Sequence, residues 1–576
     1  MNLGKIQALS VSTKAITTIL GIIQSIIIIR VLSPTEYGIT GLVMSIGGVI
    51  GVSQHLGIVD GAIREIAVRK NKSEIGKVFW VSHIARQMVT IPLSLVLALL
   101  AGLIATRVYH RPEIIPYIQI FAWALILQGL QDVLGATLTG MKKFIQLYAI
   151  QIITATVNIA VFGFLTWRYH VAGFFWAIIL TTLIMVVLIG GIVAKELAGN
   201  LALPSGKEIK QYGKNLLHIS VFMYISRIFY VIWQRLPILI LGAIISGDQL
   251  GYLNISLTFG SKLIILAAAL SEVNLSWMST LFATSMKKFL GVAEHTMQRV
   301  LILLSIITVT LIFFIPEILH LIIRKSAYYP ATPYIIIMTM AFFLYSLIDI
   351  GTSSLFVPAN KPKLRALTFG ILTAVAAIGS GIAIYSGNPI VVAVITMCVS
   401  ALIAYLFMVI TAWRLFAINL IPVRILTMLV ILGASAVFLY ADPSLTARII
   451  VYVLIGLYMA HEAYQHLMKK EAPEIAATNS IKIICFAGAL YNQSSWTNRQ
   501  HIMAQLSKNY SVLYVEPRIW IIRYIAENIL KPKKIIQFFM RSLRHEKISD
   551  TLYVKSQWNI IPGSREFKII SKFNHW

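Results

Sequence analysis

The sequence has little charge for its length. Asp, Glu, Lys and Arg make up 12% of the 576 residues, and the 22 acidic residues are fewer than half of the 49 basic ones. Soluble domains carry about 25% charged residues. Apolar residues reach 58%, and apolar runs long enough to cross a bilayer core of about 30 Å recur from Leu9 to Met468. These runs exclude a soluble globular protein and predict an all-α polytopic membrane protein.

Cysteine and the common catalytic motifs are also scarce. Cys398 and Cys485 lie far apart in the chain, so neither a disulfide framework nor a cysteine metal site is predicted. No Walker-type phosphate loop, zinc-ligand spacing or G-x-S-x-G turn is present. We therefore expect no cofactor, no metal ion and no catalytic residue. No Ala-x-Ala cleavage site follows the first apolar run, so we expect that run to be a retained helix rather than a cleaved signal.

The lengths of the apolar runs predict about fourteen transmembrane helices. Their approximate cores are residues 9–31, 38–60, 78–106, 114–140, 146–167, 171–194, 215–245, 250–284, 299–323, 333–357, 366–386, 389–413, 422–441 and 445–468.

Basic residues alternate with these helices. If the N-terminus is cytoplasmic, the inside segments hold about 23 Lys and Arg against about 7 outside, as the positive-inside rule expects. A fringe of basic residues on both sides is the simpler alternative. We predict a multi-pass protein of the inner (plasma) membrane with both termini in the cytoplasm. Topology then accounts for the net charge of +27, and nucleic acid is not expected as a partner.

The membrane region repeats itself weakly. Ser33-Pro-Thr-Glu-Tyr-Gly38 and Ser246-Gly-Asp-Gln-Leu-Gly251 lie 213 residues apart, each near the end of the first helix of a six-helix set. Two acidic pairs have similar spacing: Asp60 with Glu272, and Asp132 with Asp349. Chance is the alternative, but the matches favour two parallel six-helix lobes, 1–200 and 201–415, followed by two extra helices in 416–470.

Composition changes after the last apolar run. Residues 471–480 are polar and predict a linker. Strand-like segments at 481–486, 511–517 and 551–554 alternate with a helical pattern at 494–506. This order predicts a small cytoplasmic α/β domain over 481–576. An amphipathic basic and aromatic segment at 519–545 suits an anionic membrane surface.

The first membrane helices carry a family resemblance. Arg30-Val-Leu-Ser-Pro-Thr-Glu-Tyr-Gly38, followed by Gln54–Asp60 and Ile63-Arg64, resembles the opening of polysaccharide flippases of the multidrug/oligosaccharidyl-lipid/polysaccharide exporter superfamily. The resemblance covers about residues 1–470. It implies a transporter, not an enzyme, that moves an undecaprenyl-pyrophosphate-linked oligosaccharide to the periplasmic leaflet by alternating access. Surface polysaccharide biosynthesis is the implied process, with a polysaccharide polymerase and glycosyltransferases as candidate partners.

The C-terminal segment carries a second resemblance. Trp496, Arg499 and His501, with Glu516 in the next strand, resemble the start of GT-B glycosyltransferases of the group-1/family-4 kind. The spacing departs from that family's Trp-x-x-Arg-x-x-His run, because His501 follows Arg499 by only two residues. The resemblance implies a partial GT-B/Rossmann-like domain on the acceptor side, without the nucleotide-sugar domain. A surface or capping role is the simpler reading of His501.

Cations within the predicted helices are candidates for binding an anionic substrate, because such residues are costly in lipid. Arg227 and Arg235 are eight residues apart, about two helical turns, and share a face. Snorkelling to the headgroups and marking the inside face are the alternative roles. The candidate cavity residues are Arg30, Arg64, Arg86, Arg227, Gln234, Arg235 and Lys262.

Acids within or next to the helices are candidates for coupling or gating. They are Asp60, Asp132, Glu272 and Asp349. Structural pairing with arginines is the alternative role. Two other functions stay open: a cation-coupled multidrug exporter, which needs a titrating carboxylate in the first lobe, and a membrane-anchored glycosyltransferase subunit, which needs a donor-binding domain.

Overall fold

The computed structural model describes most of the membrane region and parts of the tail. The described residues are 3–54, 57–200, 203–206, 208–209, 212, 221–418, 430–431, 433–435, 437–439, 443–463, 483–486, 498–507, 512–520, 546–547 and 552–559. The chain divides into two compact units, Met1–Met459 and Ala460–Trp576.

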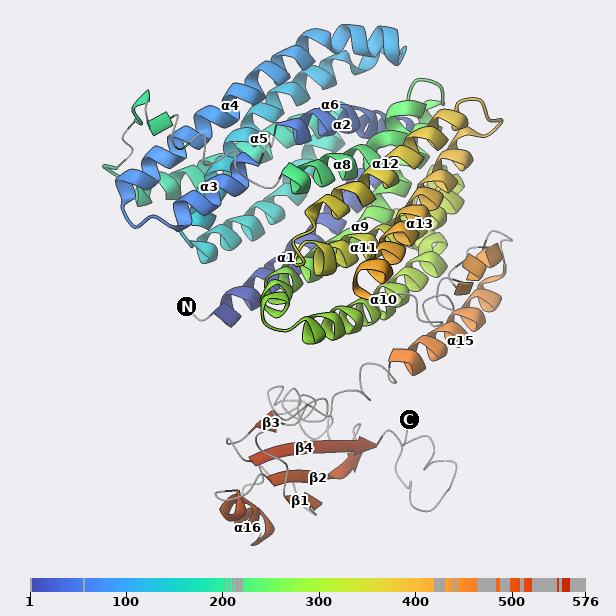
Figure 1. Cartoon of the computed structure of the whole chain (residues 1–576). Helices are drawn as coiled ribbons and strands as arrows, with labels where there is room; N and C mark the ends of the chain where they lie inside the picture. Colours follow the sequence, from blue (N-terminus) through green and yellow to red (C-terminus); the bar gives the residue numbers. More distant parts are fainter. Residues whose placement is uncertain are drawn as a thin grey trace. The chain divides into compact units, whose positions relative to one another are not determined.

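The first unit is helical (Figure 1). Ten of its described helices are long and apolar enough to cross a membrane, so the chain is a multi-pass membrane protein. The predicted helix 422–441 lies largely outside the described residues. The helices are α1 (Leu3–Val31), α2 (Pro34–Ser53), α3 (Ile58–Ala67), α4 (Lys72–Leu103), α5 (Ile115–Gly140), α6 (Phe144–Glu196), α8 (Val221–Leu241), α9 (Gly247–Thr284), α10 (Met286–Glu317), α11 (Thr332–Gly351), α12 (Pro362–Ala383), α13 (Pro389–Phe416) and α15 (Leu445–Ala463).

Short turns of other helix types join or extend these helices. They are η1 (Ile104–Val108), η2 (Pro112–Ile114), η3 (Ile318–Ile323), η4 (Ser326–Ala331) and η5 (Thr352–Phe356). The segment between α4 and α5 contains η1 and η2, and the segment between α10 and α11 contains η3 and η4. Both segments belong to the face that the charge pattern predicts to lie outside.

Two helix breaks decide how the first lobe is built. Helix α6 holds two of the predicted spans, and its backbone breaks at His170 (φ 51°, ψ −127°), in the gap expected between them. The predicted helix 38–60 is wrong at its end. Helix α2 stops at Ser53, and the left-handed Gly57 (φ 73°) starts the short, separate α3. Glycine adopts this conformation at little cost, so the chain turns where a run-length count sees one span.

The two repeat motifs form the same local structure. Ser33 caps α2 with Glu36 in a reciprocal capping box, and Ser246 caps α9 with Gln249 in the same way. In each case the serine accepts from a backbone amide and the third residue's side chain accepts from the serine's own amide. The shared capping boxes support the predicted repeat of the first two helices of each lobe.

Helix α11 forms much of the second lobe's core. Every residue from Ala341 to Gly351 is buried. The first lobe has its own apolar core, in which Val78, Val133, Leu138 and Ile189 from α4, α5 and α6 are fully buried. Helices α4, α5 and α6 therefore share one apolar centre, and α11 lies in the interior of the same compact unit, Met1–Met459.

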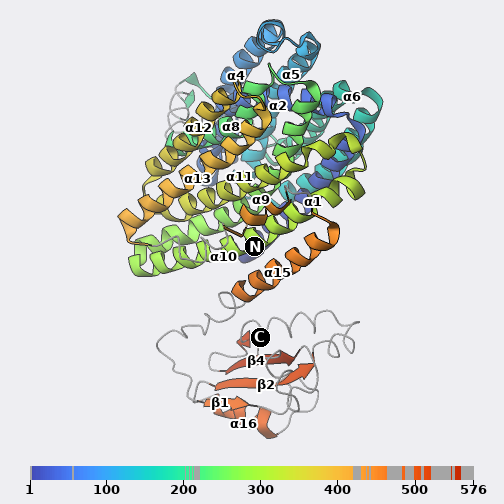
Figure 2. The ribbon, with the colours of Figure 1, turned by 90° about the vertical axis from the view of Figure 1, so that its right-hand side faces the viewer.

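The second unit contains a four-stranded sheet of order β1-β2-β4-β3. Strands β1 (Ile483–Phe486), β2 (Val512–Trp520) and β4 (Leu552–Asn559) are parallel, while β3 (Glu546–Lys547) is antiparallel to β4. Figure 2 shows β2 between β1 and β4. Helix α16 (Asn498–Leu506) follows β1, and Met503 and Leu506 pack on the buried side chains of the sheet. The predicted strand–helix–strand order is therefore present.

Candidate functional site

A cavity of about 300 Å³ lies where the two lobes meet. Helices α1, α2 and α6 of the first lobe and α8 and α9 of the second contribute to it. None of its described lining residues is acidic. The lining residues are Gln24, Ser25, Ile28, Tyr37, Thr40, Gly41, Met44, Phe162, Phe174, Ile178, Arg235, Asn254 and Thr258.

Arg235 is the charged side chain in this lining. It extends from α8 toward α2, where a Cβ on Gly48 would lie 3.7 Å from its Nε atom. The ion pairs among the described residues do not include Arg235. A cation inside a membrane protein that lacks a carboxylate partner is suited to an anionic ligand.

Lys262 stands next to the same cavity. Its Nζ atom donates to the Oγ atom of Ser25, a lining residue, at 3.3 Å. This contact joins α9 of the second lobe to α1 of the first. Lys262 is half-buried, and the described ion pairs do not include it either. Two of the predicted cavity residues therefore lie at this cavity on neighbouring helices of the second predicted lobe, Arg235 in its lining on α8 and Lys262 beside it on α9.

A hydrogen-bonded wall closes one side of the cavity. The Asn254 amide donates to the Tyr37 carbonyl at 2.7 Å, and the hydroxyls of Tyr37 and Thr258 are 2.9 Å apart. Thr258 also donates to the Asn254 carbonyl. These three residues are not among the site residues predicted from the sequence. An asparagine inside an apolar run was the available signal, because a buried amide requires partners.

The other predicted arginines lie at three further places. Arg86 is fully buried and donates to Asp132 at 2.9 Å. Arg227 is exposed on α8 and lies within electrostatic range of that pair. Arg64 is exposed on α3. Arg30 lies at the end of α1, outside the cavity lining, where its Nε atom donates to the Ile322 carbonyl at 2.7 Å.

The remaining candidates are spread along the chain. Gln234 is half-buried on α8, outside the cavity lining, and Asp60 is exposed on α3. Asp349 accepts from Arg365 at 2.6 Å. Thus Asp132 and Asp349, which occupy equivalent places in the two lobes, are both held by arginines. For four further candidates the structure describes the backbone but not the side chain: Glu272 in α9, Arg499 and His501 in α16, and Glu516 in β2. Trp496 lies outside the described residues.

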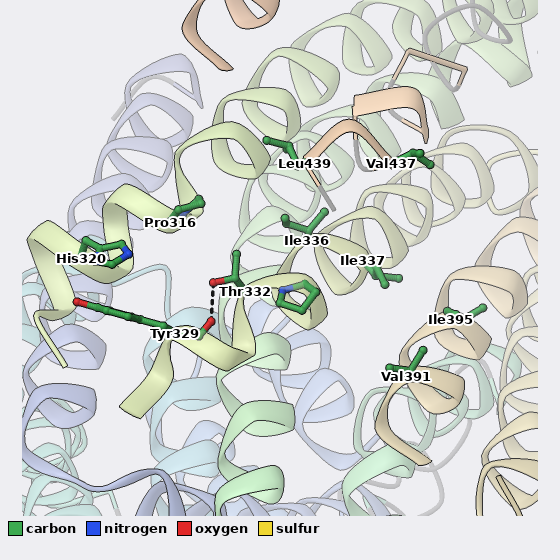
Figure 3. A pocket seen from close by; sticks show the side chains of 11 residues that line it. Pro316, His320, Tyr329, Thr332, Ile336, Ile337, Val391, Ile395, Val437 and Leu439 are labelled. Atoms are coloured by element: carbon green, nitrogen blue, oxygen red, sulfur yellow. Dashed lines mark hydrogen bonds between the residues drawn. The ribbon is translucent and has the colours of Figure 1, made fainter. Parts of the chain in front are cut away.

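A second cavity, of about 610 Å³, lies between the second predicted lobe and the segment after it, which contributes Val437 and Leu439 (Figure 3). Its lining is mostly apolar and includes Ile336 and Ile337 of α11 and Ile395 of α13. His320 and Tyr329 lie together at one end, with ring centroids 3.8 Å apart. Its chemistry suits an apolar chain rather than a charged group.

The fold has solved counterparts. It is similar to the lipid II flippase MurJ in an inward closed conformation (TM-score 0.58, 14% identity, 80% of this chain and 99% of that one). It is also similar to an inward-facing multidrug resistance MATE family transporter of the MOP superfamily (TM-score 0.55, 15% identity, 71% of this chain and 98% of that one). A third similar structure is a MOP superfamily transporter from Pyrococcus furiosus (TM-score 0.50, 12% identity, 71% of this chain and 97% of that one). The membrane unit therefore has a MOP-like transporter fold.

Comparison of sequences gives a narrower assignment. No curated protein matches the sequence at a significant level. Residues 27–314 match the family described as polysaccharide biosynthesis protein. This match covers α2 to α9 entirely, including the residues of the inter-lobe cavity on those helices. Because it spans half of the sequence, the chain belongs to the polysaccharide biosynthesis protein family.

Proposed function

We propose that this protein is a flippase that moves an undecaprenyl-pyrophosphate-linked oligosaccharide from the cytoplasmic to the periplasmic leaflet. The observation that carries the proposal is Arg235, a cation in a cavity between two lobes whose described lining has no acid. Family membership and the similarity of the fold to a lipid II flippase support it. The proposal places the chain in surface polysaccharide biosynthesis, in the inner membrane, with both termini cytoplasmic.

The cavity chemistry suits the charged part of such a substrate. A guanidinium donates two parallel hydrogen bonds to phosphate oxygens, and Lys262 adds a second positive charge nearby. Phe162 and Phe174 offer apolar ring faces in the same lining. At about 300 Å³ the cavity is at the small end of ligand sites. We therefore assign it to the pyrophosphate and the adjoining sugar rather than to the whole glycan.

The arrangement of the lobes suits alternating access. The cavity lies on the surface between two repeated units, so a change in their packing would expose it to one side or the other. The second, mostly apolar cavity offers a surface on which the lipid chain could remain in contact with hydrocarbon. In this proposal the glycosyltransferases build the lipid-linked oligosaccharide before it is flipped, and the polysaccharide polymerase uses it afterwards.

The tail is proposed to be a glycosyltransferase-like unit without activity of its own. Its parallel β1–α16–β2 unit supports this assignment. The proposal predicts no transfer of sugar by this chain alone. Sugar transfer by the purified polypeptide would favour the glycosyltransferase-subunit alternative instead.

The test of the flippase proposal is Arg235→Gln, which keeps the size and polarity of the side chain but removes its charge. We expect flipping of a lipid-linked pyrophosphoryl oligosaccharide in proteoliposomes to fall by about tenfold or more, because a charge-assisted hydrogen bond contributes about 1.5–3 kcal/mol. The variant should still insert into the membrane. Arg107→Gln, an exposed arginine in η1, is the matched control.

Normal flipping by Arg235→Gln would contradict the cavity assignment. Drug efflux that is lost on changing Asp132 would favour the multidrug exporter instead. The present contacts give that alternative less support, because Asp132 and Asp349 are already bound to arginines.

A further inference from the structure

The C-terminus of α1 is bound by the opposite lobe. The Lys325 ammonium, between α10 and α11, donates to the carbonyls of Leu32 at 2.7 Å, Val31 at 3.2 Å and Arg30 at 3.4 Å. The buried Tyr328 hydroxyl donates to the Leu32 carbonyl at 3.0 Å. A helix C-terminus has unpaired carbonyls and partial negative charge, so a cation there is well placed. We name this set of contacts the Lys325 clamp.

The C-terminus of α8 is bound in the same way by the first lobe. Arg111, between α4 and α5, donates to the carbonyls of Ile245 at 2.7 Å and Gly242 at 3.3 Å. The buried Tyr109 hydroxyl donates to the Leu239 carbonyl at 3.1 Å. We name this set the Arg111 clamp. Each lobe thus offers one cation and one tyrosine, from the segment between its third and fourth long helices, to the end of the other lobe's first helix.

The lobes also meet at the starts of α2 and α9, which follow the clamped ends of α1 and α8 in the sequence. The Thr35 hydroxyl donates to Asp248 at 2.6 Å, across the lobe boundary. The backbones approach closely enough that a Cβ on Gly38 would lie 2.7 Å from the Gly251 nitrogen. The face that contains both clamps and this contact is therefore closed, with the cavity residues Tyr37 and Asn254 further along the same two helices.

We propose that the two clamps form a pseudo-symmetric latch that holds this face closed and releases when the face opens. The proposal rests on the alternating-access function above. A cation and a tyrosine lose their carbonyl partners when the lobes separate, so each clamp stabilises only the closed state. Arg30, predicted as a substrate residue, belongs to the latch instead, because its side chain binds Ile322 of the opposite lobe while its carbonyl accepts from Lys325.

The test measures the distance between the segments that carry the clamps, without substrate. Spin labels are attached at Glu113→Cys and Ala327→Cys, two exposed positions near the clamps, after replacing Cys398 and Cys485 by alanine. Pulsed electron–electron double resonance of the protein in nanodiscs gives the ratio of long to short distances between the two labels. We expect Lys325→Met and Arg111→Met each to raise that ratio by about tenfold, as for loss of a charge-assisted hydrogen bond, and the double variant to raise it by about the product.

The control is Arg324→Met, which removes a neighbouring charge whose Nε atom donates within its own lobe, to the Leu321 carbonyl at 2.9 Å. Tyr109→Phe and Tyr328→Phe are milder variants for use if a methionine variant fails to fold, and each should give a smaller shift in the same direction. An unchanged ratio in the folded variants would overturn the latch. A shift from one clamp alone would overturn its symmetry. Because no substrate is added, either result is independent of whether the cargo is a lipid-linked glycan.

Discussion

Arginines inside the membrane helices occur in two environments. Arg86 and Arg365 are bound to carboxylates, at 2.9 and 2.6 Å. Arg235 lines a cavity, and the ion pairs among the described residues do not include it. A buried pair is neutral and mainly holds helices together, whereas a cation that faces a cavity can accept an anionic ligand. We therefore expect the arginines bound to carboxylates to be structural and Arg235 to be functional.

The Arg86–Asp132 pair gives a prediction at this scale. Asp132→Ala should destabilise the protein by about 3 kcal/mol, because it leaves the fully buried Arg86 charge without its carboxylate. Thermal unfolding of the purified protein in detergent measures the change. The double variant Arg86→Met with Asp132→Ala should recover most of the loss, since no buried charge is left over. Equal loss in the single and double variants would show that the pair's charge is not what matters.

Ionisable candidates for the proposed site are easier to predict from the sequence than neutral ones. Arg235 and Lys262 are recognisable because a charge within an apolar run is costly. Tyr37 and Phe162 carry no such mark, and their place in the cavity lining depends on which helices meet. Arg30 and Lys325 show the same limit, because their partners are backbone carbonyls nearly 300 residues away that no local pattern encodes.

At the scale of elements, the crossing of α2 and α9 depends on glycine. A Cβ on Gly251 would lie 2.0 Å from the Pro34 carbonyl oxygen, and one on Gly247 would lie 2.4 Å from Thr35. The Pro34 backbone cannot yield as a side-chain end can, whereas the atoms near Gly247 belong to the Thr35 side chain. Position 251 therefore requires a residue without a side chain for the two capped helix starts to pack this closely.

Gly251→Ala should separate α2 from α9 and destabilise the closed face by about 1–3 kcal/mol, the usual cost of overpacking. The melting temperature and the spin-label distances described above would both report it. Gly291→Ala is the matched control, because it also lies early in a long helix and a Cβ there meets nothing within 4 Å. That change should be neutral or stabilising by about 0.5–1 kcal/mol. Similar destabilisation by both changes would contradict the packing argument.

Helix positions followed from the sequence where a physical signal marked the boundary. The capping boxes at Ser33 and Ser246 and the break near His170 agree with the predicted spans. The separate helix α3 was missed, since the left-handed Gly57 that precedes it lies inside a segment counted as one apolar span. Run length measures how much chain can lie in lipid, but it does not detect a single left-handed residue.

At the scale of the molecule, the chain combines a membrane transporter fold with a separate sheet-containing unit. The compact units Met1–Met459 and Ala460–Trp576 meet within α15. Helix α15 belongs with the first unit's packing at its start, where Arg448 pairs with Glu317 of α10 at 3.0 Å. A boundary for testing the two units separately should therefore lie beyond α15, in the polar stretch 471–480 predicted as a linker.

Ending the chain after Lys470 should keep the transporter intact. The inter-lobe cavity, both clamps and the Arg448–Glu317 pair all lie before this point. Because compact units fold on their own cores, we expect membrane insertion and spin-label distances like those of the full chain. The rate of flipping in proteoliposomes should stay within about twofold of that of the full chain. The matched control inserts a protease site in 471–480 and cleaves the purified full chain. Loss of flipping after truncation but not after cleavage would assign the tail to folding, and loss after both would make it part of the transport machinery.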